Sequence, residues 1–196
     1  LKRLEGGKTD LIRAGSNQGY GAGNNLGVRF AMEKNKATHV VIANPDVFFT
    51  ESCILKLARI FSGHPHVGVA AAAMEDRNYG SSLNGWRSHG FLGQLLWMGP
   101  VSRRLFGRAL SYPKEKLEGK KAVYVDVVHG SMLMVDGKAF AECGGYDEGI
   151  FLYQEEMVLA DRMKALGYRT VLLLTEHYRH DHSVSIGKSF HQELER

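Results

Sequence analysis

The sequence predicts an α/β fold with a mostly parallel, Rossmann-like sheet flanked by helices. Over roughly the first third of the chain, short apolar runs alternate with longer segments whose apolar residues recur at helical spacing. The run Thr38–Ala43 is rich in β-branched residues, which is typical of a strand buried on both faces of a parallel sheet. The chain has 196 residues, of which 44% are hydrophobic. We therefore expect residues 1–196 to form a single domain with a sizeable core.

The first elements follow from local patterns. Thr9–Ala14 is predicted to be a strand, and a glycine-rich turn leads from it into a helix over about 26–32. After Thr38–Ala43, Thr50 has the character of a helix N-cap, and Val67–Ala73 is predicted to be the next strand. This alternation of strands and helices is what predicts a parallel sheet with helical crossovers.

Residues 76–121 break the alternation, because glycines, Pro100 and two tryptophans crowd this stretch, and we expect an excursion from the core. Beyond it, the predicted elements are a strand over 123–128, a strand over 132–135, a helix over 138–143, a helix over 155–166 and a strand over 169–174. Asp136 is expected to cap the first of these helices, and Gly167 is expected to end the second.

Composition argues against several classes of function. The formal net charge is +4, but the basic residues form no long run interleaved with aromatics, so nucleic-acid binding is not expected. No segment approaches the roughly 20 apolar residues that span a bilayer. Cys53 and Cys143 form no CxxC motif, which favours a reduced, cytoplasmic setting.

Asp46 is the first candidate for chemistry. It lies just beyond the apolar strand Thr38–Ala43, and ligands of open α/β sheets bind beyond the carboxyl ends of strands. A carboxylate there can hold Mg²⁺ or Mn²⁺ through its oxygens. The alternative is structural, because Asn44-Pro45-Asp46 is also common turn chemistry.

Glu155 and Glu156 are the second candidate, at the start of a predicted helix. A helix N-terminus favours carboxylates, so a purely structural reason for the pair exists. A general base, however, needs a carboxylate held at a cleft edge by a rigid element. The apolar approach Phe151–Tyr153 is expected to raise the pKa of one of the two glutamates by desolvation.

Two further segments are rich in polar or flexible residues. His177, His180 and His182 lie close to Arg179, and they suit phosphate or a single metal contact better than a zinc cluster; a solvated polar tail is the alternative. The glycine turn over 19–25 matches neither GxGxxG nor a Walker pattern, although it can bring backbone close to a nucleotide. Its asparagines supply amide hydrogen bonds or cap the helix.

Four motifs stand in order along the chain: Asn17–Asn25 (NQGYGAGNN), Asn44–Val47 (NPDV), Gly144–Glu148 (GGYDE) followed by Phe151–Tyr153, and the late pair His180…Ser185. In this order they resemble the motifs of family 2 glycosyltransferases, which have the GT-A fold. The resemblance covers about residues 15–185, which is nearly the whole chain.

This resemblance implies a role for each motif. Asp46 would bind a metal, Mg²⁺ or Mn²⁺, that bridges the donor diphosphate, with His180 beside it and His182 as the fallback. Glu156 would be the catalytic base of an inverting displacement, with Glu155 as the alternative. The other implied contacts are to the donor nucleotide from Asn17, Gly19, Asn24, Asn44 and Gly130, and to the acceptor from Gly145, Tyr146 and Asp147.

The sequence departs from the family pattern in three places. Glu156 stands where the family usually has Asp, and Val158 where a further acidic residue is expected. Asn44 replaces the first Asp of the DxD motif, as in rhamnosyl-transferring members. The family also opens with roughly 40–50 residues that grip the nucleotide, and these have no counterpart here. Either the chain is partial or the protein has lost its nucleotide half; we expect a partial chain, with Leu1–Glu5 as the end of that region, because a sheet without its first strand would expose apolar edges.

The resemblance also implies substrates. The donor would be a dTDP- or UDP-linked sugar, and the acceptor a saccharide or a lipid-linked molecule in bacterial surface polysaccharide synthesis. Phe91–Met98 precedes Arg103-Arg104, a combination suited either to peripheral contact with the inner face of a membrane or to a packed lid. Two other functions stay open: a nucleotidyltransferase with a similar core, and a catalytically silent sugar- or partner-binding domain. The sequence does not indicate an oligomeric state.

Overall fold

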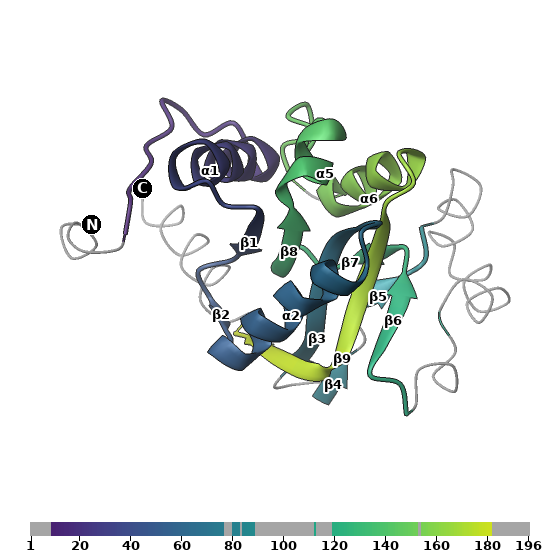
Figure 1. The fold of residues 1–196 in the computed structure, drawn as a ribbon. Coiled ribbons are helices and arrows are strands. Elements are labelled where there is room, and N and C mark those ends of the chain that lie inside the picture. Colours follow the sequence, from purple (N-terminus) through teal and green to yellow (C-terminus); the bar gives the residue numbers. More distant parts are fainter. Residues whose placement is uncertain are drawn as a thin grey trace, which may run out of the picture.

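The computed structural model describes residues 9–76, 80–82, 84–88, 112, 119–152 and 154–181. Within them, a central sheet lies between helices, as Figure 1 shows. This confirms the predicted α/β class with a helix-flanked sheet.

The helices are α1 (Tyr20–Asn35), α2 (Glu51–Gly63), α5 (Gly137–Glu142) and α6 (Glu155–Ala165). The strands are β1 (His39–Ala43), β2 (Val47–Phe48), β3 (Val67–Asp76), β4 (Gly80–Ser82), β5 (Gly85–Trp86), β6 (Ala122–Val125), β7 (Val127–Val128), β8 (Met132–Asp136) and β9 (Arg169–His180).

The main sheet has the order β1-β8-β3-β9-β2, with β4 beside β3 and β6 beside β9. The prediction of a mostly parallel sheet is wrong for the described strands, because only β3 and β9 pair in parallel. β1 and β3 do run in the same direction around α2, as the strand–helix alternation predicted. β8, however, returns between them and is antiparallel to both, so a mixed sheet results.

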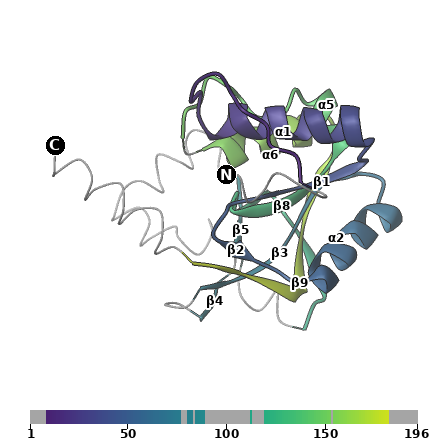
Figure 2. The ribbon, with the colours of Figure 1, turned by 90° about the vertical axis from the view of Figure 1, so that its left-hand side faces the viewer.

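Each face of the sheet has its own hydrophobic core. Figure 2 shows α2 lying apart from the group of α1, α5 and α6. Alternate residues of β3 point to opposite sides, as the period of a strand requires. Val69 and Ala71 join the core under α1, α5 and α6, whereas Ala70 and Ala72 join the core under α2. Small residues on β3 thus allow helices to pack closely on both faces of the central strand.

The predicted caps are confirmed. The Thr50 side chain accepts a hydrogen bond from the backbone N–H of Cys53 at the start of α2. Asp136 accepts one from Ala139 at the start of α5. Gly167 has a φ of +84° just beyond α6, a conformation that glycine adopts without a Cβ penalty.

One strand prediction at the beginning of the chain is wrong, and a second is confirmed as a strand but not as a fully buried one. Thr9–Ala14 is not a strand, since no described strand lies beside it to share hydrogen bonds. The segment Thr38–Ala43 does contain β1, but Ile42 is the one buried residue of that strand. β1 is at the edge of the sheet rather than at its centre, so its apolar run is covered less completely than the composition suggested.

β9 is longer than predicted. Residues 176–180, for which a solvated polar tail was the alternative, belong to this strand. The strand continues to His180, where it pairs with β2. Its register against β3 shifts between Ala72 and Ala73, whose partners are Leu173 and His177. This irregularity lets the last residues of β9 rejoin the sheet, and Tyr178 and His180 are buried there.

Most of the predicted excursion over 76–121 lies outside the described residues, including the segment Phe91–Arg104. Of the part that is described, β4 extends the main sheet and β5 pairs with β7 in a separate two-stranded sheet. Among the described residues, no helix is both long enough and apolar enough to cross a membrane.

Candidate functional site

Asp46 and His180 meet at the carboxyl end of β1. Asp46 lies in the turn between β1 and β2, and His180 is the last residue of β9. Pairing of Val47 with His180 joins the two elements, and the backbone N–H of Asp181 donates to the Asp46 carbonyl. As a result, Nε2 of His180 lies 3.2 Å from Oδ1 of Asp46, and the two side chains are only 6% and 13% exposed.

This pair has the chemistry of a small metal site. A carboxylate oxygen and an imidazole nitrogen are both ligands of Mn²⁺, and Mg²⁺ takes one or two carboxylates and completes its shell with phosphate and water. The described residues contain no group of three or more His, Cys, Asp or Glu side chains arranged to hold a metal. The pair therefore fits a metal shared with a bound phosphate, and it does not fit a closed zinc site.

Glu156 is held by the backbone of Gly130, which lies between β7 and β8. The N–H of Gly130 donates to Oε1 of Glu156 over 3.0 Å, and the carbonyl of Gly130 accepts from the Tyr20 hydroxyl over 2.6 Å. A Cβ at position 130 would overlap the Glu156 carboxylate and lie 2.8 Å from its Cδ. Only glycine leaves room for the carboxylate at this point, which explains why Gly130 interrupts an otherwise apolar segment.

The two glutamates have different surroundings. Glu155 is 2% exposed, and its Oε1 has no hydrogen-bond partner among the described residues. Glu156 is partly buried, and burial raises the pKa of its carboxyl above the ordinary value, with repulsion from Glu155 adding to the shift and the Gly130 N–H opposing it. The environment thus distinguishes Glu156 as the partly accessible carboxylate of the pair.

The predicted source of this desolvation is wrong. Phe151 and Leu152 are 60% and 51% exposed, so they do not enclose the glutamates. The groups close to Glu156 come instead from α1 and the loop before β8, namely Tyr20 and Gly130. Phe151 and Leu152 are thus surface residues, and Tyr153 lies outside the described residues.

The glycine turn packs against the segment that leads into α6. The backbone N–H of Tyr20 donates to the Phe151 carbonyl, and Gly19 has a φ of +99°. A Cβ on Gly19 would lie 2.5 Å from that carbonyl oxygen. Asn17 is exposed and accepts from the N–H of Gly19, while Asn24 donates to the carbonyl of Tyr20.

Asn25 connects α1 to the loop after α5. Its side-chain amide donates to the carbonyl of Tyr146, and its oxygen accepts from the N–H of the same residue. Tyr146 is 1% exposed, so its side chain belongs to the core and does not reach an acceptor directly. Gly145 is also buried, and its carbonyl accepts a hydrogen bond from the Arg162 side chain. Asp147 forms an ion pair with Arg162 at 2.7 Å and is partly exposed at the surface.

One residue that the motifs did not indicate lies between the two acidic positions. The ring of His129 is 5.9 Å from the ring of His180, and Gly130, which holds Glu156, is the next residue. Nδ1 of His129 is 2.9 Å from the Ser131 hydroxyl. The signal available in the sequence was a histidine directly before the glycine that interrupts the strand.

Other predicted residues are accounted for as follows. Asn44 forms the turn at the end of β1, where its N–H donates to the Ser131 carbonyl and its own carbonyl accepts from Val47. His182 lies outside the described residues. His177 is exposed on β9, away from the Asp46–His180 pair.

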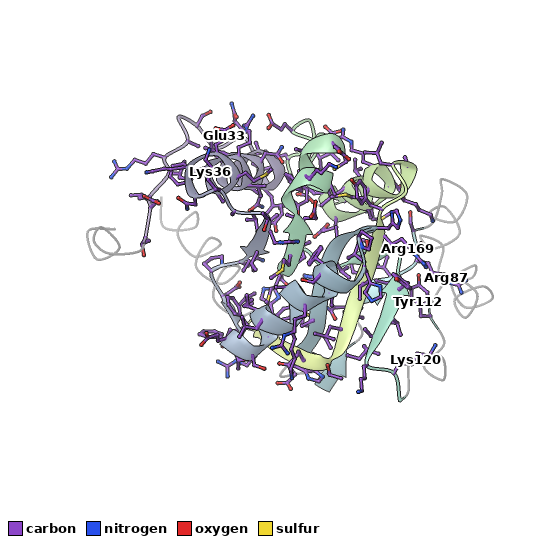
Figure 3. The ribbon with its side chains drawn as sticks, in the orientation of Figure 1. Glu33, Lys36, Arg87, Tyr112, Lys120 and Arg169 are labelled. Atoms are coloured by element: carbon purple, nitrogen blue, oxygen red, sulfur yellow. The ribbon has the colours of Figure 1, made fainter. Side chains whose placement is uncertain are left out.

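Two surface hollows lie elsewhere, along β6. Their volumes are about 300 and 440 Å³, and both are lined by Tyr124. The first also contains Tyr112 and Arg169, which Figure 3 shows on the same side of the molecule as Arg87. Arg169 begins β9, whereas His180 ends it, so these hollows are at the opposite end of that strand from Asp46.

Curated relatives support the resemblance that the motifs indicate. The chain is 28% identical over 194 residues to N-acetylglucosaminyl-diphospho-decaprenol L-rhamnosyltransferase of Mycobacterium tuberculosis, covering 91% of this chain and 60% of the relative. It is 27% identical over 153 residues to the low-salt glycan biosynthesis hexosyltransferase Agl10 of Haloferax volcanii, covering 78% and 45%. Rhamnosyltransferase WbbL of Escherichia coli is 24% identical over 193 residues, covering 92% and 69%. The chain thus spans about 60% of the length of its mycobacterial relatives.

Solved structures show a similar fold at low sequence identity. The GalNAc-T7 structure with UDP, GalNAc and Mn²⁺ has a TM-score of 0.63 and 12% identity, and the match covers 86% of this chain and 31% of that one. The structure of A197 from STIV has a TM-score of 0.53 and 13% identity, with coverage of 87% and 70%. No protein-family model matches the chain. The fold and the curated relatives together confirm the resemblance to glycosyltransferases of the GT-A fold, and the relatives that this chain is similar to are rhamnosyl- and hexosyltransferases.

Proposed function

We propose that this chain transfers a sugar from a nucleotide-linked donor to a hydroxyl group of a saccharide or lipid-linked acceptor, with inversion at the anomeric carbon. The observation that supports this most strongly is the position of two acidic groups beside one short segment. His129 lies against His180, the partner of Asp46, and the adjacent Gly130 holds Glu156. A diphosphate site at Asp46 and a base at Glu156 would therefore lie near each other, as a single displacement requires.

Asp46 and His180 would hold the metal, Mg²⁺ or Mn²⁺, with the diphosphate of the donor. When bound, such an ion supplies Lewis-acid stabilisation of the negative charge on the departing nucleotide. The two side chains are already 3.2 Å apart and largely shielded from solvent, so little reorganisation is needed to bring both onto one ion. His182 is the alternative metal ligand to His180, and this assignment rests on the motif resemblance alone.

Glu156 would act as the base. Its carboxylate takes the proton of the acceptor hydroxyl while the hydroxyl oxygen forms the new bond to the anomeric carbon. The bond from that carbon to the phosphate oxygen breaks in the same step, and the electron pair leaves with the nucleoside diphosphate. The raised pKa of Glu156 makes it a stronger base than an exposed glutamate, and the Gly130 N–H fixes one carboxylate oxygen.

Glu155 is the less suitable base, because it is 2% exposed and so has almost no access to an acceptor. On the donor side we assign Asn17 and Gly19 in the turn before α1, Asn24 within α1, and Asn44 in the turn after β1. On the acceptor side we assign Asp147, whose side chain is partly exposed, while Gly145 and Tyr146 support that loop from the core.

The relatives suggest the class of substrate. Two of them are named as rhamnosyltransferases, and one of these is named for an N-acetylglucosaminyl-diphospho-decaprenol acceptor. Together with Asn44 in place of the first Asp of the DxD motif, these names favour a deoxyhexose linked to dTDP or UDP and a lipid-linked saccharide acceptor in surface-glycan synthesis. Contact with the inner face of a membrane would then bring the enzyme to its acceptor.

The test is sugar transfer or donor hydrolysis by the natural full-length protein, with dTDP- and UDP-linked sugars, in Mn²⁺ and in EDTA. We expect metal-dependent turnover that is lost in both Asp46→Asn and Glu156→Gln. Turnover that is unaffected by both substitutions would contradict the proposed site. Absence of turnover with every donor, together with sugar binding, would favour the silent binding domain, and formation of a nucleotide-sugar from a nucleoside triphosphate and a sugar phosphate would favour a nucleotidyltransferase.

A further inference from the structure

A buried chain of hydrogen bonds connects β3 to His129. The contacts with β3 determine the orientation of its first member, Asn84. The side-chain oxygen of Asn84 accepts from the backbone N–H of Met74 over 3.0 Å. Its nitrogen donates to the carbonyl of Ala72 over 2.9 Å. These two contacts with the strand backbone leave one orientation for the Asn84 amide, because exchanging O and N would oppose like groups.

From this fixed amide, the direction of every later hydrogen bond follows. The Asn84 nitrogen donates to the Tyr178 hydroxyl oxygen over 3.3 Å. The Tyr178 proton therefore goes to the Ser131 hydroxyl, 2.7 Å away, and the Ser131 proton goes to Nδ1 of His129, 2.9 Å away.

A second contact agrees with this direction. The backbone N–H of Ser131 also donates to Nδ1 of His129, over 3.1 Å. Both groups on Nδ1 are donors, so this nitrogen carries a lone pair. The ring proton is consequently on Nε2, on the far side of the ring from the loop.

Such a network costs free energy unless every member is satisfied. Asn84, Ser131 and Tyr178 are 3%, 1% and 1% exposed. Apolar side chains of similar size would fill this space without the free-energy cost of desolvating polar groups. The network includes the half-buried His129, whose ring is 5.9 Å from that of His180. What the network achieves is one defined tautomer at the place where the diphosphate would bind.

We propose that His129 is a catalytic residue, whose Nε2–H donates a hydrogen bond to a phosphate oxygen of the departing nucleoside diphosphate, and that Asn84, Tyr178 and Ser131 are positioning residues that fix its tautomer. This inference rests on the proposed function. A fixed N–H donor directed at developing negative charge stabilises the transition state without reorganisation of the site. His129 thereby acts beside the metal pair and is not one of its ligands.

The first measurement does not depend on activity. Long-range ¹H–¹⁵N correlation spectra of the natural full-length protein report which nitrogen of a histidine carries the proton. We expect the Nε2–H tautomer for His129 in the wild type. In Tyr178→Phe, which removes the hydroxyl that orients Ser131, we expect a minor but detectable share of Nδ1–H, because the Ser131 N–H still donates to Nδ1. A wild-type His129 with its proton on Nδ1 overturns the proposal.

The second measurement compares kinetics. His129→Leu removes the donor, and we expect kcat to fall about 100-fold, the usual effect of losing one such donor, while KM and Mn²⁺ affinity stay close to those of the wild type. His129→Gln keeps an N–H donor and should recover part of the loss. Tyr178→Phe should lower kcat less than His129→Leu does, with little change in KM.

Three results would separate this inference from its alternatives. An unchanged kcat in His129→Leu overturns it, and so does loss of Mn²⁺ binding, which would make His129 a metal ligand. Isothermal titration with UDP and with dTDP in the presence of Mn²⁺ measures the affinity of the wild type and of His129→Leu, and it does not require turnover. Equal affinities for the wild type and the variant overturn the proposal. If the wild type binds these diphosphates through His129 but transfers no sugar, the proposed transfer fails while the contact stands.

Discussion

Nε2 of His180 lies 3.2 Å from Oδ1 of Asp46, although 134 residues separate them in the chain. The contact depends on the whole length of β9, since His180 reaches Asp46 only because that strand continues to pair with β2. Two potential metal ligands are therefore held by the main sheet itself, which gives them more fixed positions than mobile loops would.

Replacement of Asp46 tests the metal pair directly. Asp46→Asn keeps the size of the side chain but removes its charge, so His180 alone would face the ion. We expect Mn²⁺ affinity to fall by at least a factor of about 10 to 100 and transfer to be lost. Isothermal titration with Mn²⁺ and a nucleoside diphosphate measures this.

Asp10→Asn is the matched control for that substitution. Asp10 lies near Lys34 on the surface and takes no part in the proposed site. Its variant should bind Mn²⁺ as the wild type does. Equal affinities for the wild type, Asp10→Asn and Asp46→Asn would remove Asp46 from the metal site.

Gly130→Ala tests the position of the base. The new Cβ would overlap the Glu156 carboxylate, so the carboxylate must move and lose the N–H of residue 130. A displacement of about 1 Å at a reacting group costs about 100-fold in rate, and we expect a fall in kcat of that order. Gly27→Ala is the control, because a Cβ at position 27 of α1 meets nothing within 4 Å.

The two alanine variants should also differ in stability. Gly27→Ala lies within a helix, where alanine is favoured over glycine by about 1 kcal/mol, so its melting temperature should rise. Gly130→Ala should melt near or slightly below the wild type. Wild-type kcat in Gly130→Ala would show that the observed carboxylate position is not the catalytic one.

Glu156 links activity to stability through its raised pKa. The folded protein binds this proton more tightly than the unfolded chain, whose carboxyl titrates near 4.5. Folding stability therefore falls as pH rises from the unfolded value through the higher folded value, and the full cost is present above both. Over the same interval kcat/KM should rise, because the base becomes deprotonated.

Glu156→Gln separates these two effects. The amide carries no buried charge and still accepts from the Gly130 N–H. At neutral pH we expect this variant to be inactive and to melt at a higher temperature than the wild type, with the difference shrinking as the pH is lowered. Scanning calorimetry across the acidic range measures this, with Glu33→Gln on the exposed side of α1 as control (Figure 3). A lower melting temperature for Glu156→Gln at neutral pH would contradict a raised pKa.

The positions that were predicted correctly from the sequence depend on local chemistry. Thr50 and Asp136 cap helices because their side chains reach N–H groups three residues away, and Gly167 ends a helix for reasons of backbone conformation alone. The motif containing Asp46 was found because a polar turn after an apolar strand is visible in one short segment.

The features that were missed depend on pairing over long distances. The position of β8 between β1 and β3 is not encoded in any single segment, so the sheet was predicted to be mostly parallel. His129 gained its significance only when the irregular register of β9 placed Tyr178 and His180 beside it. Phe151 was assigned to the surroundings of the glutamates by sequence proximity, whereas Tyr20 is the aromatic residue that lies there.

Asn25 provides a test of how α1 supports the site. Its side chain makes hydrogen bonds of 3.0 and 2.9 Å with the carbonyl and N–H of Tyr146, and the residue is 7% exposed. Asn25→Ala would leave both backbone groups buried without partners, at a cost of about 2 to 4 kcal/mol. For a chain of this size we expect the melting temperature to fall by roughly 5 to 12 °C. Asn24→Ala is the matched control, since its amide donates to the carbonyl of Tyr20 one turn earlier in the same helix, and its melting temperature should change little. Equal effects of the two substitutions would mean that α1 is stabilised by its apolar contacts alone and that Asn25 does not hold the Tyr146 loop in place.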